Sequence, residues 1–86
     1  MKNIITSEKG HEVHHIVLAE EVSFFNKASI LNALNNIPKN AKVIIDCSNT
    51  KSLAYDVIEI IKNYESNAKT KNIIVEKINF IEPAAS

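Results

Sequence analysis

The hydrophobic pattern of the chain alternates between short β-branched runs and longer stretches with helical spacing. The clearest run, Val43 to Ile45, is apolar and β-branched throughout, which is typical of a strand buried on both faces. After a polar loop, one helix face is indicated by Val57, Ile60, Ile61 and Tyr64. A strand that leads through a short loop into an amphipathic helix is half of a βαβ unit. The pattern therefore predicts an α/β protein.

The N-terminal part of the chain predicts a β-hairpin. Strands are indicated over residues 4–8 and 13–19, with a turn at Gly10, the only glycine. One face of the second strand would carry His14, Ile16 and Leu18, and the other would carry Val13, His15, Val17 and Ala19. Because both sets are mostly apolar, we expect this strand to be covered on both sides for much of its length.

Two helices and two more strands follow the hairpin. Asn26 is a suitable N-cap for a first helix, whose apolar face would be Ile30, Leu31, Leu34 and Ile37, and Pro38 would end it. A strand is expected over residues 43–47. A second helix is expected over residues 55–68, with Ser52 as its N-cap. The last strand is expected over residues 73–78.

The element order is therefore β-β-α-β-α-β in one domain, 1–86, with its core in residues 13–78 and a flexible tail over residues 82–86. We expect a mixed sheet of about four strands, because the hairpin adds an antiparallel strand to the parallel ones. The strands at Val13, Val43 and Ile73 should lie side by side in that order. Right-handed crossovers then place both helices on one face and leave the other face partly open.

Composition narrows the classes of function. All ten basic residues are lysines and the formal net charge is zero. A neutral chain without arginine is a poor candidate for binding nucleic acid. No stretch approaches the ~20 apolar residues of a membrane span. The single cysteine, Cys47, cannot form an internal disulfide, and we interpret it as a small buried hydrophobic residue.

Catalytic and metal-binding patterns are weak. His11, His14 and His15 do not all point to one face of a strand, and no further ligand is placed to complete a zinc site. We expect these histidines to lie near solvent at the start of a strand. Glu20 and Glu21 are adjacent at a strand end and would point apart. No phosphate loop or nucleophile motif is present. We therefore predict no enzyme, no catalytic residues, no metal and no cofactor.

The loop between the third strand and the second helix is the most promising site. It lies at the carboxyl end of a strand and next to a helix start, where sites form in α/β sheets. Its candidate partner-binding or regulatory residues are Asn49, Thr50, Ser52, Tyr55 and Asp56. The residues alone favour a simple role for Asp56, in which its charge supports the helix start through the dipole. The alternative is that Asp56 presents a fixed negative charge to a partner.

Three stretches resemble a known family. The segment from Leu18 to Ala28, LAEEVSFFNKA, looks like the start of the STAS domain found at the cytoplasmic C-terminus of SulP-type anion transporters. The segments Val43–Ser48 and Tyr55–Val57 are similar to that family's later strand and helix start. The resemblance covers roughly Val13 to Ile78. The first stretch is fairly specific to the transporter branch, and the others are shared loosely with anti-sigma-factor antagonists.

The resemblance implies a sheet with helices on one side and a regulatory role on the cytoplasmic side of a membrane, as part of a sulfate or bicarbonate class transporter. The implied partners are the transporter's own transmembrane domain or cytoplasmic regulatory proteins, and a homodimer is left open. The alternative is a free-standing antagonist-like protein that binds a kinase. In that branch the second helix starts with Asp-Ser-Ser-Gly, and Asp56 stands at the phosphorylated serine. A nucleotide-binding module is a third, weaker interpretation.

Overall fold

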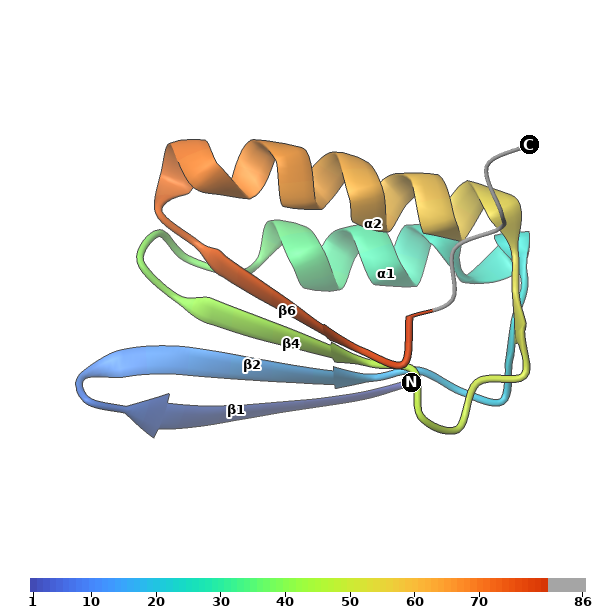
Figure 1. Ribbon diagram of the computed structural model, residues 1–86, viewed down its shortest axis with the longest axis horizontal. Coiled ribbons are helices and arrows are strands. Elements are labelled where there is room, and N and C mark those ends of the chain that lie inside the picture. Colours follow the sequence, from blue (N-terminus) through green and yellow to red (C-terminus); the bar gives the residue numbers. More distant parts are fainter. Residues whose placement is uncertain (81–86) are drawn as a thin grey trace.

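The structure is a computed structural model that describes residues 1–80 (Figure 1). The expected tail over residues 82–86 lies outside the described residues. The strands are β1 (Lys2–Glu8), β2 (His11–Val17), β3 (Glu21–Val22), β4 (Lys42–Asp46), β5 (Ser52–Leu53) and β6 (Ile74–Ile78). The helices are α1 (Lys27–Asn35) and α2 (Tyr55–Ala68), with short 3-10 turns η1 (Phe24–Asn26) and η2 (Lys69–Lys71).

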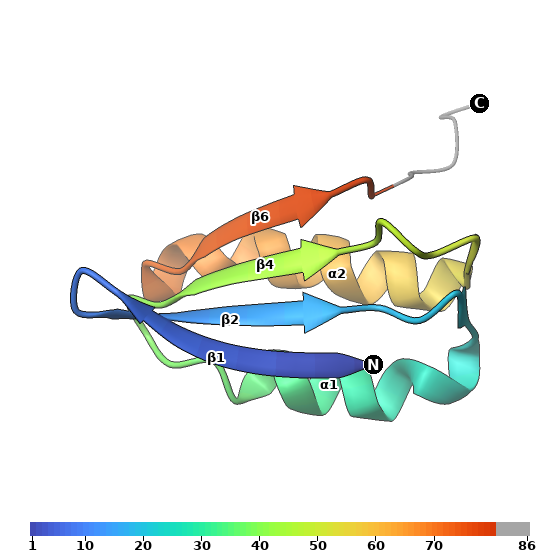
Figure 2. The ribbon, with the colours of Figure 1, turned by 90° about the horizontal axis from the view of Figure 1, so that it is seen from below.

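The main sheet has four strands in the order β1-β2-β4-β6. β1 runs antiparallel to β2, while β2, β4 and β6 are parallel to one another. Figures 1 and 2 show α1 and α2 together on one face of this sheet. The predicted class, strand order and placement of the helices are therefore confirmed. The carboxyl ends of the three parallel strands lie at the same end of the molecule as the N-termini of both helices (Figure 2).

Burial alternates along β4 because the helices cover only one face of the sheet. In β4, Val43 and Ile45 are 0% and 1% exposed beneath the helices, whereas Ile44 between them is half-buried. On the opposite face, Ile74 is 64% exposed. The expected burial of β4 on both faces is therefore wrong. On the face of β2 that points away from the helices, Val13 is 3% exposed and His15 and Val17 are half-buried, so the expected cover of β2 on both sides holds for part of its length.

The helices bury most of the residues that their spacing indicated. α1 buries Ile30, Ala33 and Leu34, and Leu31 is 41% exposed, contrary to its assignment to the apolar face. Adjacent helical residues are about 100° apart, so Leu31 turns away when Ile30 faces the sheet. Ile37 is buried just beyond the helix. The buried residues of α2 are Val57, Ile58, Ile61 and Ala68, and Ile60 and Tyr64 are partly buried against the core.

Asn26 stands at the N-cap position of α1 as expected but lacks the expected capping bond, and the expected cap at Ser52 is wrong. The Asn26 side chain does not cap α1: its Oδ1 accepts from the backbone N–H of Ser23 at 2.9 Å, and Ser23 Oγ accepts from Phe25 N. This reciprocal pair begins the 3-10 turn that precedes α1. Ser52 lies in β5, where its N–H donates to the carbonyl of Glu20, so it is too early in the chain to cap α2. The cap position of α2 is Ala54.

The histidine cluster divides between solvent and core. His14 is 3% exposed, which corrects the expectation that all three histidines lie near solvent. It faces the helices beside Val43, its partner in register on β4, and its Nε2 lies 3.2 Å from Glu12 Oε1. His11 is exposed and His15 is half-buried, and their bonds go to Asn40 and Thr6. The alternation of a strand therefore separates the three imidazoles.

Candidate functional site

Two short strands tie the loops at the carboxyl end of the sheet together. β3 and β5 pair in parallel, with Val22 opposite Leu53. Backbone N–H groups of Lys51 and Ser52 donate to the carbonyl of Glu20, and that of Ala54 donates to the carbonyl of Val22 at 2.8 Å. The loop after β4 is thereby fixed to the segment after β2. The starts of α1 and α2 are thereby held next to each other at one end of the molecule (Figure 1).

Several polar side chains of this loop form bonds within the fold. Thr50 Oγ1 donates to the carbonyl oxygen of Ala19 at 2.8 Å, so the hydroxyl hydrogen of this predicted site residue is already committed. The Ser48 backbone N–H donates to Asp46 Oδ1 at 2.9 Å. Hydrogen bonds from the side chain and backbone of Ser48 lower the pKa of Asp46 below its usual range. These groups therefore stabilise the loop.

Three aromatic side chains are exposed at the helix starts. Phe24 and Phe25 are 55% and 79% exposed, and Tyr55 is 62% exposed. The two phenylalanine rings lie 4.1 Å apart between centroids. The η1 turn that carries them packs against α2, and the bond from Ala54 to Val22 joins the residue before Tyr55 to the residue two positions before Phe24. We call Phe24, Phe25 and Tyr55 the aromatic end of the molecule.

Charged groups border the aromatic end. Lys27 Nζ, at the start of α1, lies 3.7 Å from Asp56 Oδ2, and both side chains are exposed. Asp56 is the second residue of α2, where the helix dipole favours a carboxylate. A hydrogen bond to the Glu59 side chain, followed by the charge of Glu59, raises the pKa of Tyr55. The phenol therefore stays neutral at physiological pH, with an apolar ring and a polar tip at the surface.

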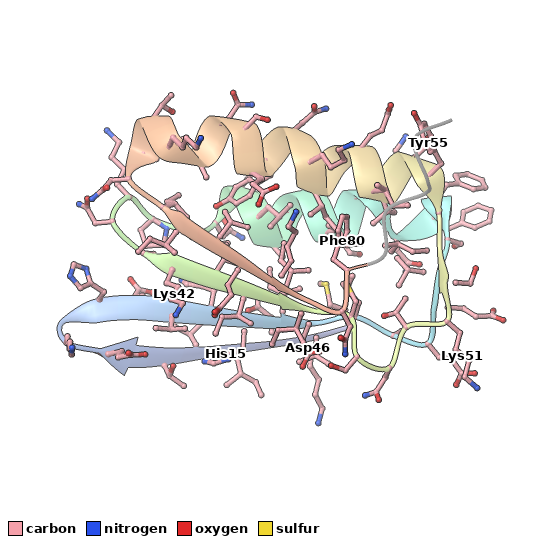
Figure 3. All side chains as sticks on the ribbon, viewed as in Figure 1. His15, Lys42, Asp46, Lys51, Tyr55 and Phe80 are labelled. Carbon is pink, nitrogen blue, oxygen red and sulfur yellow. The ribbon has the colours of Figure 1, made fainter. Side chains whose placement is uncertain are left out.

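The structure separates the five predicted site residues into two groups. Tyr55 and Asp56 lie at the helix start beside the phenylalanines. Thr50 bonds to Ala19, whereas Asn49 and Ser52 are exposed in the connecting loop and in β5. Figure 3 shows Lys51 near the level of the sheet and Tyr55 at the start of α2, at the same end of the molecule. The loop thus rises from the sheet layer to the helix layer.

Phe24 and Phe25 are the residues that sequence reasoning missed. Two adjacent phenylalanines do not by themselves indicate exposure, because neighbouring residues of a helix can both be buried, as Val57 and Ile58 are in α2. The Ser23–Asn26 spacing marks the turn that holds them. Neither side chain is buried. A pair of large exposed rings at a helix start is characteristic of a contact surface.

The groups that could support catalysis are few in the described part of the chain. Burial, followed by the charge of Asp46, raises the pKa of the Cys47 thiol, which is therefore a poor nucleophile. Cys47 is 2% exposed. Residues 1–80 contain no cluster of three or more His, Cys, Asp or Glu able to hold a metal ion. Among the helices of residues 1–80, none combines the length and apolar character required to cross a membrane.

A shallow groove lies between the two helices. Its volume is about 250 Å³, and its lining includes Leu31, Ile60 and Tyr64. The Tyr64 hydroxyl is buried without a hydrogen-bond partner among the described residues. Ligand sites usually occupy about 300–1,000 Å³, so the groove falls below that range. The aromatic end is the better candidate site because it combines exposed rings, fixed backbone and charge.

Comparisons of this chain with protein-family models, with curated proteins and with solved structures found no match. The STAS resemblance therefore remains a prediction from the residues quoted above. The coarse architecture, a mixed four-strand sheet with two helices on one face, agrees with that prediction.

Proposed function

We propose that this chain is a protein-docking domain whose aromatic end binds a partner. The exposure of Phe24, Phe25 and Tyr55 is the observation that supports this proposal. Exposed rings add little to the stability of an 86-residue chain, because folding is driven by the burial of apolar surface. Aromatic anchors are enriched at the centres of protein interfaces. The hydrogen-bonded frame beneath them reduces the ordering cost of binding.

We further propose that the partner belongs to an anion transporter of the SulP type, either its transmembrane domain or a protein that regulates it. The STAS-like segments of the sequence support this assignment. The role would be regulation or assembly on the cytoplasmic side, without catalysis. The exposed Asp56 beside Lys27 would set the electrostatic character of the contact.

The second candidate is an antagonist-like switch that binds a kinase. Asp56 is the residue on which it rests: this exposed carboxylate stands at the second residue of α2, where the antagonists that the sequence resembles carry a phosphorylatable serine, so phosphorylation itself would not operate here. A permanent charge there would imitate one state of such a switch. The two candidates use the same surface and differ in the class of partner.

Photo-crosslinking in the native cell distinguishes the transporter partner from the kinase partner. A benzophenone amino acid at position 55 replaces one aromatic ring with another and reports the protein that touches the aromatic end. Ser66 is the matched control: it is exposed on the same helix, about 16 Å further along the axis. We expect position 55, and not 66, to capture an integral membrane protein. Capture of a soluble kinase would favour the second candidate, and equal yields at both positions would contradict docking at this end.

A further inference from the structure

β1 forms an unprotected edge of the main sheet. All seven of its residues are exposed, and within residues 1–80 it pairs with β2 alone. Ile4 and Ile5 are 51% and 57% exposed. Natural edge strands are usually short, bulged, interrupted by proline, or charged along their length. β1 has none of these features: its register with β2 is unbroken from Lys2 to Glu8, and its charges stand only at its two ends.

The opposite edge of the sheet differs. β6 is a shorter strand of five residues, and Glu76 and Lys77 occupy its middle. Charges in the middle of an edge strand disfavour pairing with another chain. The contrast makes β1 the edge that is suited to accept a strand.

The sequence of β1 is complementary to itself in the antiparallel direction. With a two-fold axis at Ile5, Lys2 of one copy faces Glu8 of the other at both ends of the pair. Asn3 then faces Ser7, and Ile5 faces its own copy. Facing residues point to the same side of the sheet, so the charges and the isoleucines lie within reach of their partners. Within residues 1–80, neither Lys2 nor Glu8 takes part in an ion pair, so both are available.

Other registers lose this complementarity. A shift of two residues in either direction leaves one charged end without a partner and places the other opposite Thr6 or Ile4. A parallel, in-register arrangement would set Lys2 against Lys2 and is incompatible with a closed two-fold dimer. The arrangement centred on Ile5 is the one that overlaps the whole strand and pairs both charges.

We propose that two copies of this chain associate through their β1 strands, forming one continuous sheet from two four-stranded halves. The backbone N–H and C=O groups on the outer side of β1 would form the new ladder, as in strand addition. The area of a single strand pair is small, so the dimer should be weak and dependent on concentration. The proposal is independent of the partner that binds the aromatic end.

A charge-exchange cycle tests this register with the 86-residue chain. Lys2→Glu and Glu8→Lys each place like charges opposite each other, whereas the double variant restores opposite charges with their order reversed. Sedimentation equilibrium at low salt measures the dimer dissociation constant for each protein. We expect each single variant to weaken association by about tenfold and the double variant to recover to within about threefold of the original chain.

Two further variants control for unfolding and for other surfaces. Ile5→Lys places two lysines at the axis and should abolish the dimer, whereas Ser66→Lys on the exposed side of α2 should leave it unchanged. Circular dichroism verifies that each variant is folded. A chain that remains monomeric at about 1 mM would overturn the proposal. A dimer that none of the β1 changes affects would also overturn it, since another surface would then be responsible.

Discussion

The ammonium group of Lys27 lies 3.7 Å from a carboxylate oxygen of Asp56 and links the start of α1 to the start of α2. Both side chains are exposed, at 43% and 53%. An ion pair between exposed side chains stabilises a fold by about 1 kcal/mol or less. The contact therefore matters less for folding than for the charge that it presents beside the aromatic end.

The substitution Asp56→Lys tests that distinction. It removes a favourable helix-dipole interaction of about 0.3–1 kcal/mol and places two lysines together, so unfolding should become easier by about 1–2 kcal/mol at most. Capture by the benzophenone at position 55 should fall by about tenfold, because a charge of the wrong sign at an interface is strongly unfavourable. Denaturant titration and crosslinking yield are measured side by side. An unfolded variant would show instead that Asp56 serves the helix alone.

Tyr64→Phe should leave the protein as stable as before or stabilise it by about 1 kcal/mol. The Tyr64 hydroxyl is buried without a hydrogen-bond partner among residues 1–80, and burial raises its pKa. Removing an unsatisfied buried hydroxyl while keeping the ring relieves a desolvation cost. Urea unfolding provides the measurement, with Tyr55→Phe as the exposed control. A loss of more than about 1 kcal/mol would mean that the hydroxyl has a partner in solution.

Cys47 should resist thiol reagents while the protein is folded. Its side chain is 2% exposed, so a reagent can hardly reach the sulfur. Burial and the neighbouring Asp46 also raise its pKa, so little of the reactive thiolate is present. Reaction with Ellman's reagent at pH about 8 should be at least about a hundredfold slower in the folded chain than in urea. Equal rates in the two conditions would show that the end of β4 opens readily.

Acid should destabilise the loop after β4 through Asp46. Its pKa in the folded protein is lowered from the usual 3.8 by bonds from Ser48. A carboxyl group whose pKa is lower in the folded protein than in the unfolded protein stabilises the fold at pH values above the unfolded pKa. That stabilisation is lost as the pH falls through the folded pKa. The window therefore lies below 3.8. Between about pH 4 and about pH 2, the melting temperature should fall further for the original chain than for Asp46→Asn. If the melting temperatures of the two proteins fell equally with pH, Asp46 would not be responsible for the loss of stability.

The sequence was sufficient to predict the main sheet because its elements have strong periodic patterns. The run from Val43 to Ile45 and the apolar face of α2 identified a βαβ unit, and the handedness of crossovers then determined the strand order. Very short strands contain too few residues to show a hydrophobic periodicity. β3 and β5 have two residues each, so neither could be recognised, and Ser52 was assigned as a cap although its backbone bonds to Glu20.

The candidate site was predicted only in part. Tyr55 and Asp56 follow directly from the helix start, which the pattern located. Phe24 and Phe25 are distant in sequence and come to the same end through the pairing of Val22 with Leu53. Nonlocal contacts of this kind leave no mark in the spacing of residues along one segment. The burial of His14 likewise depends on helices that pack over β2 from later in the chain.

The central claim is that the aromatic end is a partner surface and not part of the folding core. The most direct measurement combines Phe25→Ser with the benzophenone at position 55 and records crosslinking yield and unfolding free energy on the same protein. Because Phe25 is 79% exposed, we expect unfolding to change by less than about 1 kcal/mol and the yield to fall by about tenfold or more. An unchanged yield in a folded variant would contradict the claim.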